Sequence, residues 1–583
     1  MHFFICVNRC FLGAQKILSQ MAQERHRCIF LSGQISIQQN MRKVPVYSAA
    51  AVCDASKAAL NTTAGLQIKT KLIDQLTEAE RRTPANVGRQ KSHIFITLYF
   101  NIQNTAAMND NNSRRNFIKN AALTATGFYI VPRHVLGRGY IAPSDKLNIA
   151  GIGAGGKAEV NLPYAWNNGS ENIAALCDVD DRMAVKARTK WPKAPYYKDY
   201  RELLDKEHKN IDAVIVTTPD HMHAPIALAA MQLGKHVYCE KPLTHDIYEA
   251  RILTKAAAKY KIVTQMGNQG SSGDDTRLVE TWIQAGLIGD VHTVHVWTNR
   301  PVWPQGIPTP TGKFDIPKEL DWDLWLGTAP FRDFNPTYLP ATWRGWTDFG
   351  TGSLGDMGCH FIDVPYRALN LGYPVAVSCS VGSVFSGFFK EEVYTDSYPP
   401  SSVTYIKFPA RNNLLPVELV WYDGGIQPRR PDELLPDEQM GEWDGGIIFE
   451  GTKGKLMAGL FGRNPTLLPT RRMKEVTLPA SKYPFVERGS EGHQTQWVNA
   501  CKKGYGAYTS SSFDKSGPLA ETVLMGNLAV QSYNFQEKNS KGEVTYPGRK
   551  QLLWDGENQR ITNFEPANQF VKREYRGDYQ LAL

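Results

Sequence analysis

The sequence has no cysteine pattern that would hold a metal ion. Its nine cysteines include four in the first tenth of the chain, and the others stand alone: Cys177, Cys239, Cys359, Cys379 and Cys501. No Cys-x-x-Cys pair and no cysteine–histidine spacing of a zinc or iron–sulfur site occurs. Isolated cysteines beside apolar neighbours are typical of small buried side chains. We therefore predict no metal centre.

The sequence also lacks concentrated positive charge in its main part. The formal net charge is +9, but residues 1–107 hold 13 of the 66 Lys and Arg residues and only 5 of the 57 Asp and Glu residues. The rest of the chain is therefore almost neutral. Nucleic-acid binding needs basic residues clustered on the folded part, so this class of function is excluded. The length, 583 residues, is enough for two well-packed domains with extra segments.

No apolar run is long enough for a comfortable transmembrane helix, which needs about 20 residues. The uncharged run from Asn120 to Val131 is shorter, and it follows Ser113-Arg-Arg-Asn-Phe-Ile-Lys119. Twin arginines, an aromatic residue two positions on and a short apolar region resemble a twin-arginine export signal. The alternative is a surface Arg-Arg pair before a small helix.

Residues 1–107 show no sustained helical or strand period, although Ile94–Phe100 could form a strand. Export signals work at the N-terminus, so we hypothesise that translation starts at Met108. Residues 1–107 would then be an unstructured or mistakenly included upstream extension, and residues 108–145 an export signal and linker. This predicts a periplasmic or exported protein; without a start at Met108 the protein would be cytoplasmic.

A glycine-rich turn follows the apolar run Leu147–Ala150. Gly151, Gly153 and Gly156 match the G-x-G-x-x-G pattern of dinucleotide-binding folds. In that pattern the first glycine permits a tight turn, the second lets the backbone approach a pyrophosphate, and the third allows close helix–strand packing. The phosphates would lie at the N-terminus of a helix starting near Gly156, where free N–H groups and the helix dipole favour anions.

A second apolar strand, Ile173–Cys177, ends in Asp178, 22 residues after Gly156. This is the expected position of an acid that accepts hydrogen bonds from the adenosine ribose. A carboxylate there repels a 2′-phosphate, so the sequence favours NAD over NADP. Arg182 leaves NADP open, since an arginine can pair with that phosphate.

Strands and helices continue to alternate, which predicts a parallel, doubly wound sheet over residues 146–270. The predicted elements are strand Ala213–Val216, helix Ala224–Leu233, strand His236–Cys239, helix Ile247–Tyr260 and strand Ile262–Met266. In such sheets ligands bind beyond the carboxyl ends of the strands. Polar segments follow three of those ends, at Thr217–Asp220, Glu240–Pro242 and Gly267–Gln269. Each alone could be an ordinary polar turn, but three at one edge favour a binding site.

Further on, Asp356 and His360 are four residues apart and would lie on one face of a helix. The unperturbed pKa of histidine, about 6.5, suits a group that takes and returns a hydroxyl proton. Asp356 could orient His360 or hold a neighbouring substrate hydroxyl. A buried structural Asp–His pair is the alternative.

Three motifs in this order carry a family resemblance: Gly151-x-Gly153-x-x-Gly156, Cys239-Glu-Lys-Pro242 and Asp356-x-x-x-His360-x-x-Asp363. They resemble the glucose–fructose oxidoreductase/inositol dehydrogenase/MocA (Gfo/Idh/MocA) family, from about Lys146 to the C-terminus. The resemblance implies an α/β fold. It comprises an N-terminal Rossmann domain and a C-terminal α/β domain, residues 271–583, with a large open, mostly antiparallel sheet. The active site would lie between the two domains.

By position, Lys241 matches the family's lysine that bridges nicotinamide and substrate hydroxyl, while Asp356 and His360 match its acidic residue and general acid/base. His223 resembles a histidine in the loop after the strand at 213–216, although a surface role is equally open. The residues predicted to bind the cofactor are Gly151, Gly153, Gly156, Asp178, Thr218, Pro219, Glu240 and Lys241.

The chain departs from the family pattern in two respects. It has Gly350-Thr-Gly352 where the family has a glycine triplet, and its second domain is longer, as in an exported bacterial subgroup with an extended C-terminal part. Clusters of Trp, Tyr and Arg indicate a sugar pocket, because sugar ring faces stack on aromatic rings. We predict Trp343, Arg344 and Tyr422 near the substrate.

The function predicted is reversible NAD-linked oxidation of a secondary hydroxyl of a sugar, glycoside or cyclitol. Because free NAD is scarce outside the cytoplasm, we expect a tightly held cofactor. The resemblance also implies a homo-oligomer formed through the open sheet. One alternative is an NAD-dependent glycosidase that oxidises C3 transiently and eliminates the aglycone. We rank it second, because relatives of that kind lack the intact Glu-Lys-Pro that this chain has. Another alternative is a sensor that binds a dinucleotide without turning it over. The presence of Lys241, Asp356 and His360 together argues against a sensor.

The export hypothesis makes a direct prediction about the native protein. N-terminal sequencing of the mature product should find no residue from 1–107. A mature chain that retains any of these residues would contradict a start at Met108.

Overall fold

The computed structural model describes residues 145–411 and 413–583. The predicted upstream extension and almost all of the predicted export signal lie outside this part, so both stay predictions. Among the described residues, no helix has the length and apolar character needed to cross a membrane.

The N-terminal part of the described chain is built on a parallel six-stranded sheet. Its strand order, β3-β2-β1-β4-β5-β6, is that of a doubly wound dinucleotide-binding fold. The strands are β1 (Asn148–Ile152), β2 (Asn172–Cys177), β3 (Tyr196–Tyr197), β4 (Ala213–Val216), β5 (His236–Cys239) and β6 (Thr264–Met266). The connecting helices are α6 (Ala158–Trp166), α7 (Asp181–Lys190), α8 (Tyr200–Glu207), α9 (His223–Gln232) and α10 (Ile247–Lys259). The predicted parallel sheet is confirmed.

Local sequence explains these elements. All four residues of β4 are fully buried, as expected for a central parallel strand covered by helices on both faces. Three of the helices start at an aspartate whose carboxylate accepts a backbone N–H of the first turn: Asp180 before α7, Asp199 before α8 and Asp246 before α10. Glu249 completes a capping box on α10.

The second sheet has nine strands in the order β15-β14-β13-β7-β12-β11-β8-β18-β19. Only the pairing of β7 with β12 is parallel, so the predicted mostly antiparallel sheet is confirmed. Its strands are β7 (Val291–Thr298), β8 (Ala376–Val381), β11 (Ser402–Phe408), β12 (Val417–Tyr422), β13 (Gly445–Gly451), β14 (Gly454–Ala458), β15 (Thr466–Leu468), β18 (Leu552–Asp555) and β19 (Arg560–Ile561). Two short hairpins stand outside it, β9 (Val384–Gly387) with β10 (Lys390–Glu392) and β16 (Glu537–Lys538) with β17 (Val544–Thr545).

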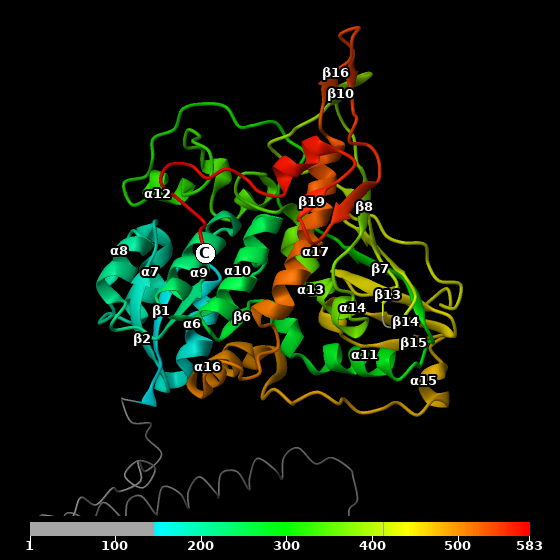
Figure 1. Cartoon of the computed structure of the whole chain (residues 1–583), viewed down its shortest axis with the longest axis horizontal. Coiled ribbons are helices and arrows are strands. Elements are labelled where there is room, and N and C mark those ends of the chain that lie inside the picture. Colours follow the sequence, from blue (N-terminus) through cyan, green and yellow to red (C-terminus); the bar gives the residue numbers. More distant parts are fainter. Residues whose placement is uncertain (1–144, 412) are drawn as a thin grey trace, which may run out of the picture. The chain divides into compact units, whose positions relative to one another are not determined.

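Helices of the C-terminal part join the two sheets. The long helix α17 (Phe513–Tyr533) packs against α10 on one side and against α13 (Gly352–Phe361), β8 and β11 on the other (Figure 1). A bidentate ion pair between Arg251 of α10 and Glu521 of α17 ties this contact. Helix α16 (His493–Lys503) returns to α6, where Trp497 is fully buried in the core beneath β1 and β2. The remaining helices here are α11 (Asp274–Gln284), α14 (Asp363–Ala368) and α15 (Arg472–Glu475).

Residues 301–349, between β7 and α13, form a separate aromatic cluster that we call the cover. It contains the short helix α12 (Trp322–Leu326). The buried aromatic residues of the cover are Trp322, Trp325, Phe334, Tyr338, Trp343, Trp346 and Phe349. The cover is hydrogen-bonded to the segment after β2, through Asp181 N to Glu319 O (3.1 Å) and Asp321 N to Val179 O (2.9 Å). It is therefore anchored beside the carboxyl ends of the parallel strands.

Candidate active site

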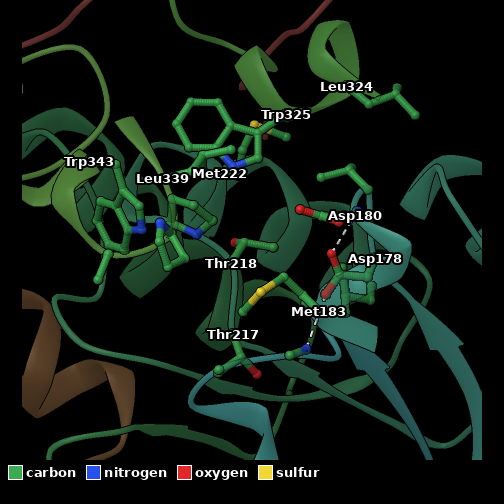
Figure 2. A pocket seen from close by; sticks show the side chains of 18 of the residues that line it. Asp178, Asp180, Met183, Thr217, Thr218, Met222, Leu324, Trp325, Leu339 and Trp343 are labelled. Atoms are coloured by element: carbon green, nitrogen blue, oxygen red, sulfur yellow. Dashed lines mark hydrogen bonds between the residues drawn. The ribbon is translucent and has the colours of Figure 1, made fainter. Parts of the chain in front are cut away.

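A cleft of about 1030 Å³ opens at the carboxyl ends of the parallel strands. This is at the upper end of the range for small-molecule sites, roughly 300–1,000 Å³. Figure 2 shows Trp325 and Trp343 of the cover on one side of the cleft, and Asp178, Met183 and Thr217 on the other. Lys241 and His360 both line this cleft. Lys241 follows a strand of the parallel sheet and His360 belongs to the domain of the second sheet, so the fold brings these two predicted catalytic residues together.

The glycine-rich turn forms one wall. Gly153 has φ +80°, and a Cβ there would lie 2.7 Å from the carbonyl carbon of Thr217, so only glycine fits. The close approach to helix α6 occurs at Gly151, where a Cβ would lie 2.9 Å from Leu162. The prediction that Gly156 allows this packing is wrong, because no atom lies within 4 Å of the position that a Cβ would take there. Glycine is favoured at position 156 by its φ of +56°.

Asp178 lies where the sequence predicted it, at the end of β2 in the cleft wall. Its carboxylate accepts hydrogen bonds from the backbone N–H groups of Ala154 (2.8 Å), Gly155 (3.1 Å) and Asp180 (3.0 Å). Burial nevertheless raises its pKa to about 6, against the effect of these hydrogen bonds. Arg182, whose charge is compatible with NADP, donates to both carboxylate oxygens of Asp180 (2.8 and 2.6 Å), so Asp180 competes with a 2′-phosphate for this half-exposed guanidinium.

The cleft offers the groups that a nicotinamide dinucleotide needs. Helix α6 starts in the cleft wall beside the glycines, so the positive end of its dipole favours a pyrophosphate there, although the N–H groups of Ala158, Glu159 and Val160 already donate to backbone carbonyls. The buried hydroxyls of Thr217 and Thr218 have no hydrogen-bond partner among the described residues, although both residues line the cleft. Unpaired buried hydroxyls are costly, which suits a bound ligand. The residues present therefore fit NAD.

Lys241 connects the two parts of the site. Its Nζ donates to the carboxylate of Asp356 (2.7 Å) and to the backbone carbonyl of the same residue (2.8 Å). Arg344 Nε donates to the same carboxylate oxygen (3.1 Å). Burial by itself raises the pKa of Asp356, but the charges of Lys241 and Arg344 outweigh this and hold it well below its usual range. Asp356 therefore stays ionised and holds the lysine in place.

His360 lies one turn further along α13, on the same side of the helix as Asp356. Its Nδ1 is buried and has no hydrogen-bond partner among the described residues, and its ring packs edge-on against Phe461 (5.0 Å between centroids). Burial, followed by the positive charge of Lys241, lowers the pKa of His360 well below 6.5. The imidazole is therefore neutral at physiological pH and can accept a proton. Asp356 is engaged with the two cations rather than with this ring.

Two of the three predicted substrate residues line the cleft. Trp343 and Arg344 lie in its wall, with the guanidinium 4.4 Å from the indole ring centroid. Tyr422 does not line it: its hydroxyl contacts His295 Nδ1 (3.0 Å) on the second sheet. Because side chains alternate along a strand, the neighbouring Trp421 enters the core and Tyr422 points to the opposite face. We therefore withdraw Tyr422 as a substrate residue.

Of the other predicted cofactor residues, Thr218, Pro219 and Glu240 line the cleft. The Glu240 carboxylate also accepts hydrogen bonds from Asn161 (2.8 Å) and Gln269 (3.2 Å), so it anchors the strand end. His223 is buried, which excludes the surface role left open by the sequence. Sequence reasoning missed the apolar wall supplied by Phe334, Leu339, Pro340 and Ala341, because nothing in the cover's composition shows which of its residues face a ligand.

Comparison with known families agrees with this geometry. Residues 147–268 match the model of an oxidoreductase family with an NAD-binding Rossmann fold, and residues 290–380 match the model of its C-terminal α/β domain. Residues 147–268 and 290–380 are thus similar to the two domains of the Gfo/Idh/MocA oxidoreductase family, as the three motifs predicted.

Three curated relatives are similar to parts of the chain. An α-N-acetylgalactosaminidase of Shewanella oneidensis is 28% identical over 185 residues, 30% of this chain and 40% of the relative. A scyllo-inositol 2-dehydrogenase (NADP(+)) of Bacillus subtilis is 27% identical over 256 residues, 44% and 56%. A levoglucosan dehydrogenase of Pseudarthrobacter phenanthrenivorans is 27% identical over 228 residues, 37% and 50%. The chain thus spans about half the length of the relatives it matches.

The charge of Asp178 leads to a prediction about the relative affinities for NAD and NADP. Asp178→Asn removes the charge that repels a 2′-phosphate, so the ratio of the Kd for NADP to the Kd for NAD should fall about tenfold, ~1.4 kcal/mol. In the unaltered protein the same ratio should fall as the pH is lowered through about 6, because Asp178 then takes up a proton. Calorimetric titration with both cofactors measures this. Glu159→Gln, an exposed acid on α6 paired with Lys186, is the matched control. An unchanged ratio in Asp178→Asn would contradict the assignment.

Proposed function

We propose that this chain catalyses the reversible NAD-linked oxidation of a secondary hydroxyl group of a sugar, glycoside or cyclitol. One observation carries the proposal: Lys241 and His360 line the same cleft as the glycine-rich turn and Asp178. The names of the inositol and levoglucosan dehydrogenases support this substrate class.

Each residue of the site has a defined task in this reaction. Bound in the cleft, the nicotinamide ring supplies the acceptor or donor of hydride. Neutral His360 accepts the proton of the substrate hydroxyl. Lys241, held by Asp356, donates a hydrogen bond to the oxygen as negative charge develops on it. Burial and Lys241 also make the protonated form of His360 a strong acid, so it returns the proton readily when a carbonyl is reduced.

The cover supports a tightly held cofactor. The backbone of Asp180 pairs with that of Leu320, and Lys198 Nζ donates to Glu319 O (2.5 Å), both at the end of the cleft marked by Asp178. Tyr579 of the C-terminal segment lines the same end. A dinucleotide beneath these contacts between the cover and the segment after β2 would dissociate slowly. An exported enzyme would need this, because free NAD is scarce outside the cytoplasm.

The proposal also includes that the protein is exported and that it forms a homo-oligomer.

A second function has its own support. The similarity to an α-N-acetylgalactosaminidase favours a glycosidase that uses the bound dinucleotide. In that reaction transient oxidation of one carbon acidifies the neighbouring C–H, the aglycone leaves by elimination, water adds and the carbon is reduced again. Net hydrolysis of chromogenic glycosides without accumulation of reduced cofactor would favour this function over a dehydrogenase.

Substitution of Lys241 tests the catalytic assignment. Lys241→Met should lower kcat by roughly 10²–10³, the cost of losing one hydrogen-bond donor to a developing oxyanion. Absorbance of reduced nicotinamide, followed over a panel of sugars, glycosides and cyclitols, measures it. Lys206→Met, which removes an exposed lysine of α8, is the control. Full activity of Lys241→Met would refute the mechanism.

The depressed pKa of His360 makes a separate prediction. As the pH is lowered, kcat/KM should fall only below pH 6.5, because His360 takes up a proton there and can no longer accept one from the substrate.

Cofactor retention can be measured without a substrate. The purified native protein should release about one equivalent of nicotinamide dinucleotide on denaturation, because the cover slows dissociation. Lys198→Ala removes the bond to Glu319 and should give a protein that loses the dinucleotide faster during dialysis. Native protein that is free of cofactor and binds it in rapid exchange would show that the cover does not retain it.

A further inference from the structure

Residues 571–583, which follow the short helix η10 (Glu565–Phe570), run back along the first domain without forming a helix or a strand (Figure 1). We call them the strap. Arg573 binds the carboxylate of Glu249 at the start of α10 (2.8 Å), and the hydroxyl of Tyr575 donates to the same oxygen (2.5 Å). Further on, Gln232 of α9 donates to the carbonyl oxygen of Ala582 (2.9 Å). The strap is therefore tied to the first domain in both its early and its late part.

The middle of the strap is tied to the cover and to α8. The guanidinium of Arg576 donates to the carboxylate of Asp323 in the cover (2.6 Å) and to the backbone carbonyl of the same residue (2.8 Å). Two residues later, Asp578 forms an ion pair with Arg201 of α8 (3.4 Å). The strap thus joins the cover to the first domain, and Tyr579 comes directly after this junction.

Tyr579 lines the cleft in which Asp178 marks the adenosine end. Its ring is half-buried, and the guanidinium of Arg201 lies over it, 5.0 Å from the ring centroid. Tyr200, which also lines the cleft, is a close neighbour: burial, followed by the Tyr579 hydroxyl, raises the pKa of Tyr200. Tyr200 follows β3, the strand next to β2 in the sheet. Tyr579 therefore lies at the end of the cleft that contains Asp178.

This end of the cleft suits the adenine of a dinucleotide. In this fold the acid after β2 accepts hydrogen bonds from the adenosine ribose, so the adenine end lies beside Asp178, whereas Lys241 and His360 mark the nicotinamide end. Nucleic-acid bases have flat π-faces and stack on aromatic side chains. Tyr579 offers such a ring to the cleft, and the hydrogen bonds that hold the strap come from its other residues.

We propose that Tyr579 binds the adenine ring of the dinucleotide and that the strap forms a wall of the adenosine end of the cleft. Because the strap joins the cover to α8 at this end, it hinders release of the adenosine half. The inference rests on the cofactor of the proposed function, but neither on the substrate nor on turnover. Tyr579 also packs against buried residues of the first domain, so the tests must separate contact with adenine from a purely structural role.

Photolabelling of the full chain tests the contact directly. The probe is an NAD analogue that carries an azide on its adenine ring and, when irradiated, forms a covalent bond to a residue beside the base. The label should appear in the tryptic peptide that begins at Gly577 and contains Tyr579, and excess NAD should suppress it. Label confined to other peptides would overturn the proposal. This test uses the unaltered protein, so it does not depend on whether a variant folds.

The release of NADH tests what the contact contributes. Excess NAD is added to the full chain loaded with NADH, and the fluorescence of the reduced nicotinamide gives the dissociation rate. Tyr579→Ala should release NADH about ten times faster, because the stacking on the base is lost. Tyr579→Phe keeps the ring and should release NADH at the rate of the unaltered protein. Tyr505→Ala, which alters an exposed tyrosine in the loop after α16, is the matched control. An unchanged rate in Tyr579→Ala would overturn the proposal.

Reduced NMN, which has the nicotinamide but no adenine, separates the adenine contact from a general loosening of the cleft. Fluorescence titration should give the same Kd for reduced NMN in Tyr579→Ala and in the unaltered protein. A Kd that rises as much as the release of NADH accelerates would overturn the adenine contact. A protein that oxidises no sugar, glycoside or cyclitol but passes these binding tests would refute the proposed function and leave this inference standing.

Discussion

The site depends on one carboxylate shared by two cations. Asp356 belongs to a helix of the second domain, whereas Lys241 follows a strand of the first, and their contact of 2.7 Å sets the distance between the two domains at the cleft. Arg344 adds a second positive charge at the same oxygen. A buried carboxylate that lost these partners would be strongly destabilised, so the arrangement holds both domains in one relative position. Burial, followed by the positive charge of Lys241, lowers the pKa of the neighbouring His360.

Several features of the chain serve this contact. The long helix α17 packs against α10 of the first domain and against α13 of the second, and its ion pair with Arg251 is largely buried. Arg573, in the C-terminal segment, binds Glu249 at the start of α10 and donates to the carbonyl of His221. The end of the chain lies beside α9, where Gln232 donates to Ala582 O (Figure 1). Residues distant in sequence therefore fix the loops that carry the active groups.

Features of short range could be predicted from the sequence. The glycine-rich turn, the acid at the end of β2 and the strands at 213–216 and 236–239 depend on residues within about thirty positions, and they lie where we expected them. Asp356 and His360 lie on one helical turn for the same reason. The predictions for Gly156 and Tyr422 are wrong, because the surroundings of these two residues are decided by packing that the local sequence does not show. Leu162 approaches Gly151 rather than Gly156, and the register of β12 within the sheet turns Tyr422 away from the cleft.

The sequence alone determined the family, the cofactor-binding fold and the residue types available for chemistry, since each follows from local spacing and from the periodicity of buried strands and helices. Only the tertiary structure decided the role of each group. Asp356 holds Lys241 instead of orienting His360, Arg182 is occupied by Asp180, and His223 is enclosed between two loops. The reason is physical: hydrogen-bond partners depend on how the loops pack, whether the partner is 2 residues away, as for Arg182, or 115 residues away, as for Lys241, and the spacing of residue types does not record that packing.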